Sequence, residues 1–85
     1  MRPVSERLFT ALMLDLPLSP AAICDFGIVS PAHHSALQRA VRSGVTLQDL
    51  DAAFGDGQSL TNLVRGHVPG PAVVFVTPYD TPDAR

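Results

Sequence analysis

The sequence predicts a small all-α domain, a bundle of five short helices followed by one short β-strand. Two observations predict the helices: apolar residues recur at helical spacing, and Ser or Thr residues stand where helices would begin. A third predicts the strand, because residues 72–76 are a run of small, β-branched and aromatic residues directly after a stretch rich in proline and glycine. With 85 residues, 46% of them hydrophobic, the chain can form a single apolar core.

The first helix is expected over Ser5–Leu14. Ser5 would cap it, and the negative charge of Glu6 suits the positive end of the helix dipole. Pro17 cannot continue a helix and ends this segment. The apolar stripe of the helix comprises Leu8, Phe9, Leu12 and Met13.

Residues 18–44 predict two further helices joined by a tight turn. Each would begin at a Ser-Pro pair, because Ser caps the free N–H groups and proline at the first helical position gives up no hydrogen bond. These pairs are Ser19-Pro20 and Ser30-Pro31, and Gly44 would end the second of the two helices. Residues 27–29 would form the turn, with an apolar anchor. This is the layout of a helix-turn-helix, whose second helix enters the DNA major groove.

The helix expected after Ser30 has one apolar and one polar face. At 100° per residue, the inward stripe comprises Ala36, Leu37, Ala40 and Val41. Ser35, Gln38, Arg39 and Arg42 would point outward, while His33 would face the apolar stripe and His34 would lie on its flank. No Asp or Glu occurs from Phe26 through Gln48. A phosphate backbone could therefore approach this helix without local repulsion.

Two more helices and a strand are expected in the second half of the chain. Thr46 would cap a helix over 47–54, and a further helix over 59–65 would end at Gly66. The strand at 72–76 has no partner strand in the chain, so we expect it to pair with its copy in a second subunit. The alternative is that this region folds back over the helices through Val73, Phe75 and Tyr79. Residues 77–85 are expected to be a frayed tail.

Composition excludes several function classes. The net charge of −2 argues against a sequence-blind nucleic-acid binder, although the six basic residues, all arginine, allow a local positive face. The single cysteine, Cys24, cannot form an internal disulfide, and no signal peptide or long apolar run is present, so a cytoplasmic location with no membrane contact is expected. No cofactor or small-molecule ligand is expected.

Neither a metal site nor an enzyme is expected. Cys24, His33, His34 and His67 lack the spacing of a zinc site, and adjacent histidines on a helix point about 100° apart, so packing is the better account of His33. Cys24, Asp25 and His33 resemble a nucleophile and base only by residue type, with no glycine-rich loop or paired carboxylates beside them.

Residues 18–44 also resemble a known family. Where the Cro/CI-like (XRE) helix-turn-helix family has Ser or Thr, then Leu or Ile, Ala, Val and Ser, this chain has Ser19, Ile23, Cys24, Val29 and Ser30. The resemblance covers residues 5–66 by helix number and order, and implies a lambda-repressor-like fold of the kind found in small plasmid and phage repressors. It implies that Cys24 is the small residue where the two helices touch, Ser35 a polar groove residue and Leu37 a core residue. The family's turn glycine would fall at Ile28, and its recognition-helix aliphatic at His34.

A second helix-turn-helix frame is possible at residues 46–66. There the outward side chains would be Gln58, Ser59, Thr61, Asn62 and Arg65, and the predicted strand would follow as in a minimal Cro layout. In this frame Asp49, Asp51 and Asp56 would face phosphates, which favours the first frame. Whether helix 31–43 or helix 58–65 is the recognition helix stays open.

The functional expectation is a homodimeric transcriptional repressor that binds a palindromic operator in double-stranded DNA through residues 1–66, with residues 67–85 as a strand and tail. Gln38 suits adenine, Arg39 suits guanine and Arg42 suits phosphate, while Arg2 and Arg7 could add contacts to the DNA backbone. The expected DNA-binding residues are Ser30, His34, Ser35, Gln38, Arg39 and Arg42. The alternative is a protein-binding adaptor, such as an antitoxin or an inhibitory phage protein.

Overall fold

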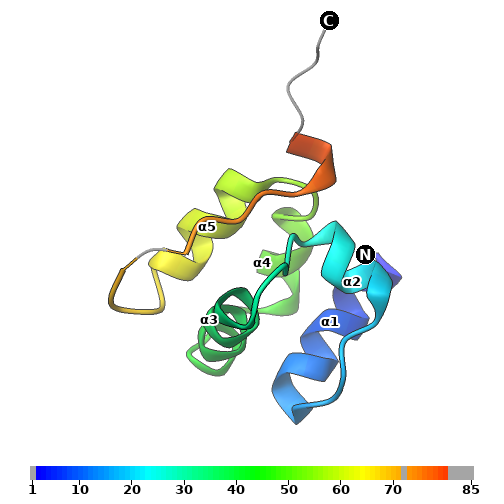
Figure 1. Ribbon diagram of the computed structural model, residues 1–85. Helices are drawn as coiled ribbons and strands as arrows, with labels where there is room; N and C mark the ends of the chain where they lie inside the picture. The colour runs from blue at the N-terminus through cyan, green and yellow to red at the C-terminus, as the bar shows by residue number, and fades with distance from the viewer. Residues whose placement is uncertain (1, 72, 81–85) are drawn as a thin grey trace, which may run out of the picture.

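The computed structural model describes residues 2–71 and 73–80, which form five α-helices and one short 3-10 helix (Figure 1). The all-α class is confirmed. None of these helices is both long and apolar enough to cross a membrane. The elements are α1 (Pro3–Leu14), α2 (Pro20–Asp25), α3 (Pro31–Arg42), α4 (Leu47–Ala52), α5 (Gly57–Arg65) and η1 (Pro78–Asp80).

Three helix starts follow the sequence prediction. The side chains of Ser19 and Ser30 accept hydrogen bonds from backbone N–H groups three residues further on, of Ala22 and His33. Thr46 does the same for Asp49, whose carboxylate accepts the Thr46 N–H in return. Each cap satisfies N–H groups that the first turn of a helix leaves free.

Two helix starts differ from the prediction. Ser5 does not cap α1, which begins at Pro3; the Ser5 side chain is buried, and its hydroxyl donates to a carboxylate oxygen of Asp51 in α4 at 2.9 Å. Helix α5 begins at Gly57, two residues earlier than expected, because the Asp56 carboxylate accepts the Ser59 N–H and caps it. An Asp at this position is as good a cap as Ser.

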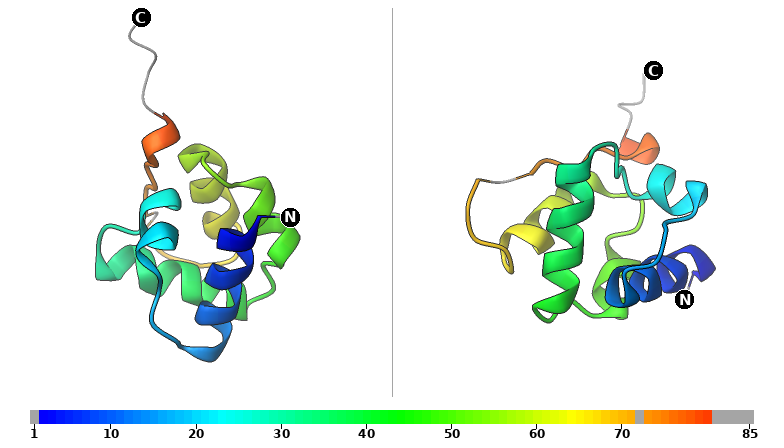
Figure 2. Two further views of the ribbon diagram at one scale, coloured as in Figure 1. Left: turned by 90° about the vertical axis from the view of Figure 1, so that its right-hand side faces the viewer. Right: turned by 60° about the horizontal axis from the view of Figure 1, so that its bottom comes forward.

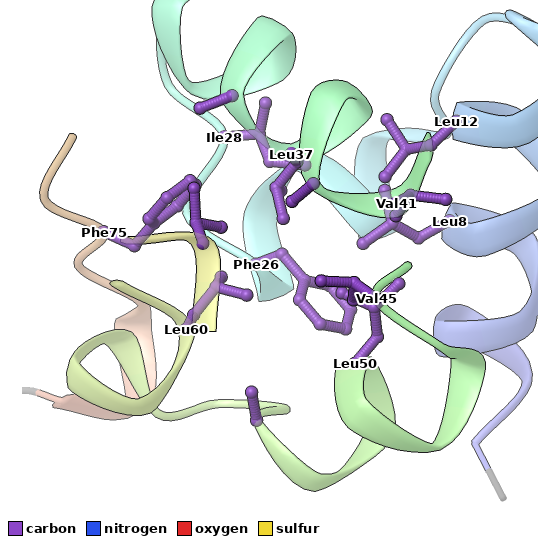
Figure 3. Close-up of a cluster of buried hydrophobic side chains, with 14 of the residues drawn as sticks. Leu8, Leu12, Phe26, Ile28, Leu37, Val41, Val45, Leu50, Leu60 and Phe75 are labelled. Atoms are coloured by element: carbon purple, nitrogen blue, oxygen red, sulfur yellow. The ribbon is translucent and has the colours of Figure 1, made fainter. Parts of the chain in front are cut away.

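The core lies between α1, α3, α4 and α5. Helix α1 packs against α2, α3 and α4, while α3 also packs against α5, so α3 lies between α1 and α5 (Figure 2). The apolar stripe expected on α3 is confirmed, because its four residues are all buried. Figure 3 shows side chains from every part of the chain meeting there, among them Leu8, Phe26, Leu37, Leu50, Leu60 and Phe75.

The predicted strand is absent from the described residues, and Ala72 lies outside them. Phe75 is only 2% exposed and fills the core between α3 and α5. Its N–H donates to the Thr61 hydroxyl at 2.8 Å, and the Val74 carbonyl accepts from the His33 ring at 2.8 Å. Side chains of α5 and α3 thus take the place of a neighbouring strand, which is the fold-back arrangement that the sequence left open.

Residues 77–80 are not a frayed tail but part of the fold. The Thr77 hydroxyl donates to the Gly55 carbonyl at 3.0 Å, and the Gly57 N–H donates to the Asp80 carboxylate. The Tyr79 hydroxyl donates to Asp25 in α2 at 3.0 Å. We call residues 73–80 the C-terminal strap, which runs along α5 and reaches α2 (Figure 1). The rest of the expected tail, residues 81–85, lies outside the described residues.

Candidate nucleic-acid interface

A compact connection of residues 26–30 joins α2 to α3. Gly27 has a φ of +64°, a left-handed conformation that glycine adopts at no steric cost. A Cβ atom at Gly27 would also collide with the Val76 carbonyl of the strap. Ile28, at 5% exposed, is the apolar anchor of the turn, whereas Val29 is 77% exposed. The glycine thus lets the strap cross the connection at close range.

The contact of α2 with the core differs from what the family resemblance implied. Cys24 was expected where the two helices touch, but its side chain is exposed. Ala22 is the small buried residue of α2, at 1% exposed, and Ile23 is 38% exposed. The buried face of α2 is therefore rotated away from the residues that carried the resemblance.

One ridge of α3 is free for a partner. Ser35, Arg39 and Arg42 are exposed and follow one another at i, i+4 and i+7, which places them on one side of the helix, opposite the buried Leu37. Among the described residues, neither guanidinium has a hydrogen-bond or ion-pair partner. We call these three residues the α3 ridge.

Ser30 and Gln38 are committed to internal contacts. The half-buried Ser30 caps α3, and its hydroxyl lies 2.7 Å from His33 Nδ1. Gln38 is also half-buried, and its amide nitrogen donates to Asp15 Oδ1 at 3.0 Å and to the Leu12 carbonyl at 3.3 Å. The Gln38 amide, expected to face DNA, thus joins α3 to the end of α1.

His34 faces a groove and not the α3 ridge. This half-buried side chain lines a shallow depression of about 520 Å³ together with residues of the α1–α2 loop, α2 and the turn. The six expected DNA-binding residues therefore fall into two sets. Ser35, Arg39 and Arg42 form the exposed ridge, while Ser30, Gln38 and His34 lie toward α1 and α2.

Asp15 brings a negative charge close to α3. It follows α1 in a left-handed conformation with a φ of 57°, and contacts Gln38, which lies 23 residues away. The sequence from Phe26 through Gln48 is free of acids, but the space around α3 is not. At 100° per residue, the residues of the α3 ridge lie roughly 40–100° around the helix axis from Gln38, so the Asp15 carboxylate lies on the flank of the ridge, closest in angle to Arg42.

In the second helix-turn-helix frame, residues 46–66, one of the side chains expected to point outward is buried. Thr61 is buried at 6% exposed, and its hydroxyl donates to the Gly57 carbonyl and accepts the Phe75 N–H. The strap covers that side of α5, and Asp56 and Asp80 lie at its N-terminal end. The exposed side chains left on α5 are Gln58, Ser59, Asn62 and Arg65. Two carboxylates beside so short a helix disfavour contact with phosphate.

His33 is a packing residue, as the sequence indicated. Its ring meets the Phe75 ring edge to face, with centroids 4.9 Å apart. Because Nε2 must donate to the Val74 carbonyl, neutral His33 accepts the Ser30 hydroxyl at Nδ1. No group of three or more His, Cys, Asp or Glu residues in the described part of the chain could hold a metal ion. Sequence reasoning did not predict that the side chains of His33 and Thr61 bond to the backbone of the strap and hold it in place.

Comparison with known proteins adds no assignment. No protein-family model matches the chain, and neither the curated proteins nor the solved structures contain a match. The α3 ridge and its surroundings are therefore the features of this protein that bear on its function.

Proposed function

We propose that this protein binds double-stranded DNA in a sequence-specific manner, with α2 and α3 as a helix-turn-helix and α3 as the recognition helix. The observation that carries the proposal is the α3 ridge, in which two exposed guanidinium groups follow an exposed serine on one side of a well-capped helix, and neither has a partner among residues 2–71 and 73–80. The major groove admits an α-helix, and arginine is the side chain most often used to read guanine there.

Within the ridge the three side chains have different expected roles. Arg39, near the middle of the exposed part, would contact a guanine through two hydrogen bonds to O6 and N7. Ser35, one turn closer to the start of α3, would contact a base edge or a phosphate. Arg42, in the last turn, would contact phosphate and fix the register of the helix on the duplex.

The net charge of −2 is compatible with this proposal because most acids have structural partners. Asp49 and Asp56 cap helices, Asp51 accepts from the Ser5 hydroxyl, and Asp80 holds the strap. Their charge still reduces affinity for DNA of any sequence, which favours a protein that depends on base contacts for discrimination.

A single α3 ridge would contact few base pairs, so we propose a homodimer on a palindromic operator. Two α3 helices would then lie in successive major grooves about 34 Å apart. Occupying a promoter in this way would make the protein a repressor in the cytoplasm, of the same type as the small Cro/CI-like repressors that residues 18–44 resemble.

The test is selection of bound duplexes from a random pool, followed by affinity measurement on the enriched sequence. Arg39→Ala is compared with Arg65→Ala, which removes an exposed arginine from α5. We expect enrichment of an inverted repeat, a steep loss of affinity with salt, and a loss of roughly tenfold or more for Arg39→Ala, since a good bidentate base contact contributes about 1–3 kcal/mol. Arg65→Ala should change affinity far less.

Two results would contradict the proposal. If Arg65→Ala weakens binding more than Arg39→Ala does, then α5 and not α3 contacts DNA. If no sequence is enriched and affinity is the same for every duplex, the protein-binding alternative, an antitoxin-like or inhibitory adaptor, is favoured.

A further inference from the structure

An apolar groove lies beside the start of α3, on a different side of the helix from the α3 ridge. It is about 520 Å³ in volume and is formed by the α1–α2 loop, by α2 and by the connection to α3. Its lining is Asp15, Leu16, Pro17, Leu18, Ile23, Ile28, Val29, Ser30, Pro31 and His34. Most of these side chains are apolar, as in surfaces that bury themselves against another protein.

Three of the eight large apolar side chains that are exposed among the described residues line this groove. Leu16 is 47% exposed, Ile23 38% and Val29 77%. No residue within 2–71 or 73–80 covers them, although each would gain about 25 cal/mol for every Å² removed from water. Their burial against another chain would therefore be favourable.

Two titratable side chains line the groove within the described part of the chain, the carboxylate of Asp15 and the imidazole of His34. They form no ion pair with each other, and the His34 ring has no hydrogen-bond partner among the described residues. One surface thus carries an acid and a base that are not bonded to each other within one chain, where Asp15 accepts from the Gln38 amide instead. A two-fold axis solves this, because it places residue i of one copy against residue j of the other, and j against i.

We propose that a second copy of this chain docks in the groove, with the apolar side chains of the two copies packed together. Asp15 would pair with His34 of the partner subunit, and the same pair would form again on the other side of the two-fold axis. The groove presents both a carboxylate that accepts hydrogen bonds and an imidazole that can donate one, and this self-complementarity is the reason to choose a second copy over a foreign protein.

This interface replaces the strand pairing that the sequence suggested, because strap backbone groups already bond to Thr61 and His33. It also leaves the α3 ridge uncovered. At 100° per residue, Ser35, Arg39 and Arg42 lie roughly 80–140° around the helix axis from His34. Self-association can be measured with no DNA present, so the failure of this proposal and the failure of DNA binding are separate results.

The first test measures the monomer–dimer equilibrium of the full chain by sedimentation. Leu16→Asp places an unpaired charge in the groove, and its matched control Val76→Asp makes the same change at an exposed valine of the strap. We expect the wild type to dimerise, Leu16→Asp to weaken the dimer at least about tenfold, and Val76→Asp to leave it unchanged. Circular dichroism of each variant shows whether it is folded.

The second test exchanges the two charged groups. Asp15→His places imidazoles opposite each other across the two-fold axis, and His34→Asp places carboxylates opposite each other. Each single variant should weaken the dimer by about threefold to thirtyfold, since by symmetry it removes both copies of an exposed pair. The double variant should restore the dimer, because it rebuilds the pairs with their members exchanged.

Three outcomes would overturn the proposal. A wild-type chain that stays monomeric at high concentration excludes the second copy and leaves the groove to a foreign partner. A dimer weakened by Val76→Asp and not by Leu16→Asp places the interface on the strap. A double charge exchange as weak as the single variants shows that Asp15 and His34 do not meet across an interface.

Discussion

The backbone nitrogen of Gly57 lies 2.9 Å from one carboxylate oxygen of Asp80 and 3.0 Å from the other. The first residue of α5 thus donates its N–H group to a side chain 23 residues further along the chain, at the end of the strap. The backbone N–H and the hydroxyl of Thr77 bond to the same carboxylate. This carboxylate fastens the strap to α5, and with it the Phe75 side chain in the core.

Replacing Asp80 by Asn should destabilise the fold by on the order of 1 kcal/mol at neutral pH. The negative charge strengthens hydrogen bonds from backbone N–H groups, but the group is only half-buried, so solvent screens part of the effect. Chemical denaturation followed by circular dichroism measures the change. Asp49→Asn is the comparison variant. It changes a carboxylate in the capping box of α4 that bonds only three residues away, whereas Asp80 bonds to a residue 23 positions away. A free energy of unfolding unchanged in Asp80→Asn would contradict the role assigned to the strap.

The fold should lose stability as the pH falls through the acid range. Hydrogen bonds from the backbone N–H groups of Thr77 and then Gly57 lower the pKa of Asp80 from its ordinary value, and those from the Arg2 N–H and the Ser5 hydroxyl lower the pKa of Asp51. The unfolded chain then binds more protons than the folded chain, so this stability is fully present above about pH 4 and is lost as the pH falls through the folded-state pKa values. Urea unfolding at several acid pH values tests this, and the slope should be smaller in Asp80→Asn.

Gly57→Ala should be strongly destabilising. A Cβ atom at this position would collide with the Phe75 carbonyl and the Asp80 carboxylate, so the strap would have to move away from α5. We expect a loss of about 1–3 kcal/mol, typical of overpacking. The control is Gly66→Ala, where the nearest atoms would be 3.6 Å away and the φ of −72° suits alanine. Equal thermal midpoints for the two variants would show that the close approach at Gly57 is not required.

Thr61→Val should cost about 1–3 kcal/mol, although it keeps the shape of the side chain. The hydroxyl of this buried residue accepts the Phe75 N–H, and its loss leaves that N–H buried and unpaired. Thr10→Val, on the exposed side of α1, is the matched control and should be nearly neutral. Hydrogen exchange at the Phe75 amide gives a second measurement, since its protection should fall in Thr61→Val alone.

Tyr79 should ionise at unusually high pH. The hydrogen bond to Asp25 and then the negative charge of that carboxylate raise the pKa of Tyr79 above its ordinary value of 10.0. Because the chain has a single tyrosine, the ultraviolet absorbance of phenolate reports on this residue alone. Asp25→Asn should lower the titration midpoint toward the ordinary value. An identical midpoint in both proteins would show that the strap does not reach α2 in solution.

The parts of the fold that could be predicted depend on contacts between near neighbours. The caps at Ser19, Ser30 and Thr46 each join a side chain to an N–H three residues away, and the buried stripe of α3 follows from helical periodicity alone. The strap could not be predicted in the same way. Its run of β-branched residues predicted a strand, which is absent from the described residues, because β-propensity does not say what the backbone bonds to.

In the candidate site, too, the properties that depend on near neighbours in the sequence were predicted, and the long-range contact of Gln38 was not. Periodicity placed Ser35, Arg39 and Arg42 outward, and they are exposed. It also placed Gln38 outward, where the structure instead has its amide bonded to Asp15. A helical wheel gives the direction of a side chain but not the neighbour that it meets.

The sequence by itself determined which segments are helical, where three of them begin and which side of α3 is apolar, because these properties arise within a few residues. Only the tertiary structure decided that residues 73–80 are a strap and not a strand, that Thr61 is buried, and that Asp15 lies beside α3. Each of these depends on groups between 14 and 54 residues apart that meet only when the chain folds. No local pattern encodes such a meeting, because the free energy that favours it comes from filling one core and pairing its buried polar groups.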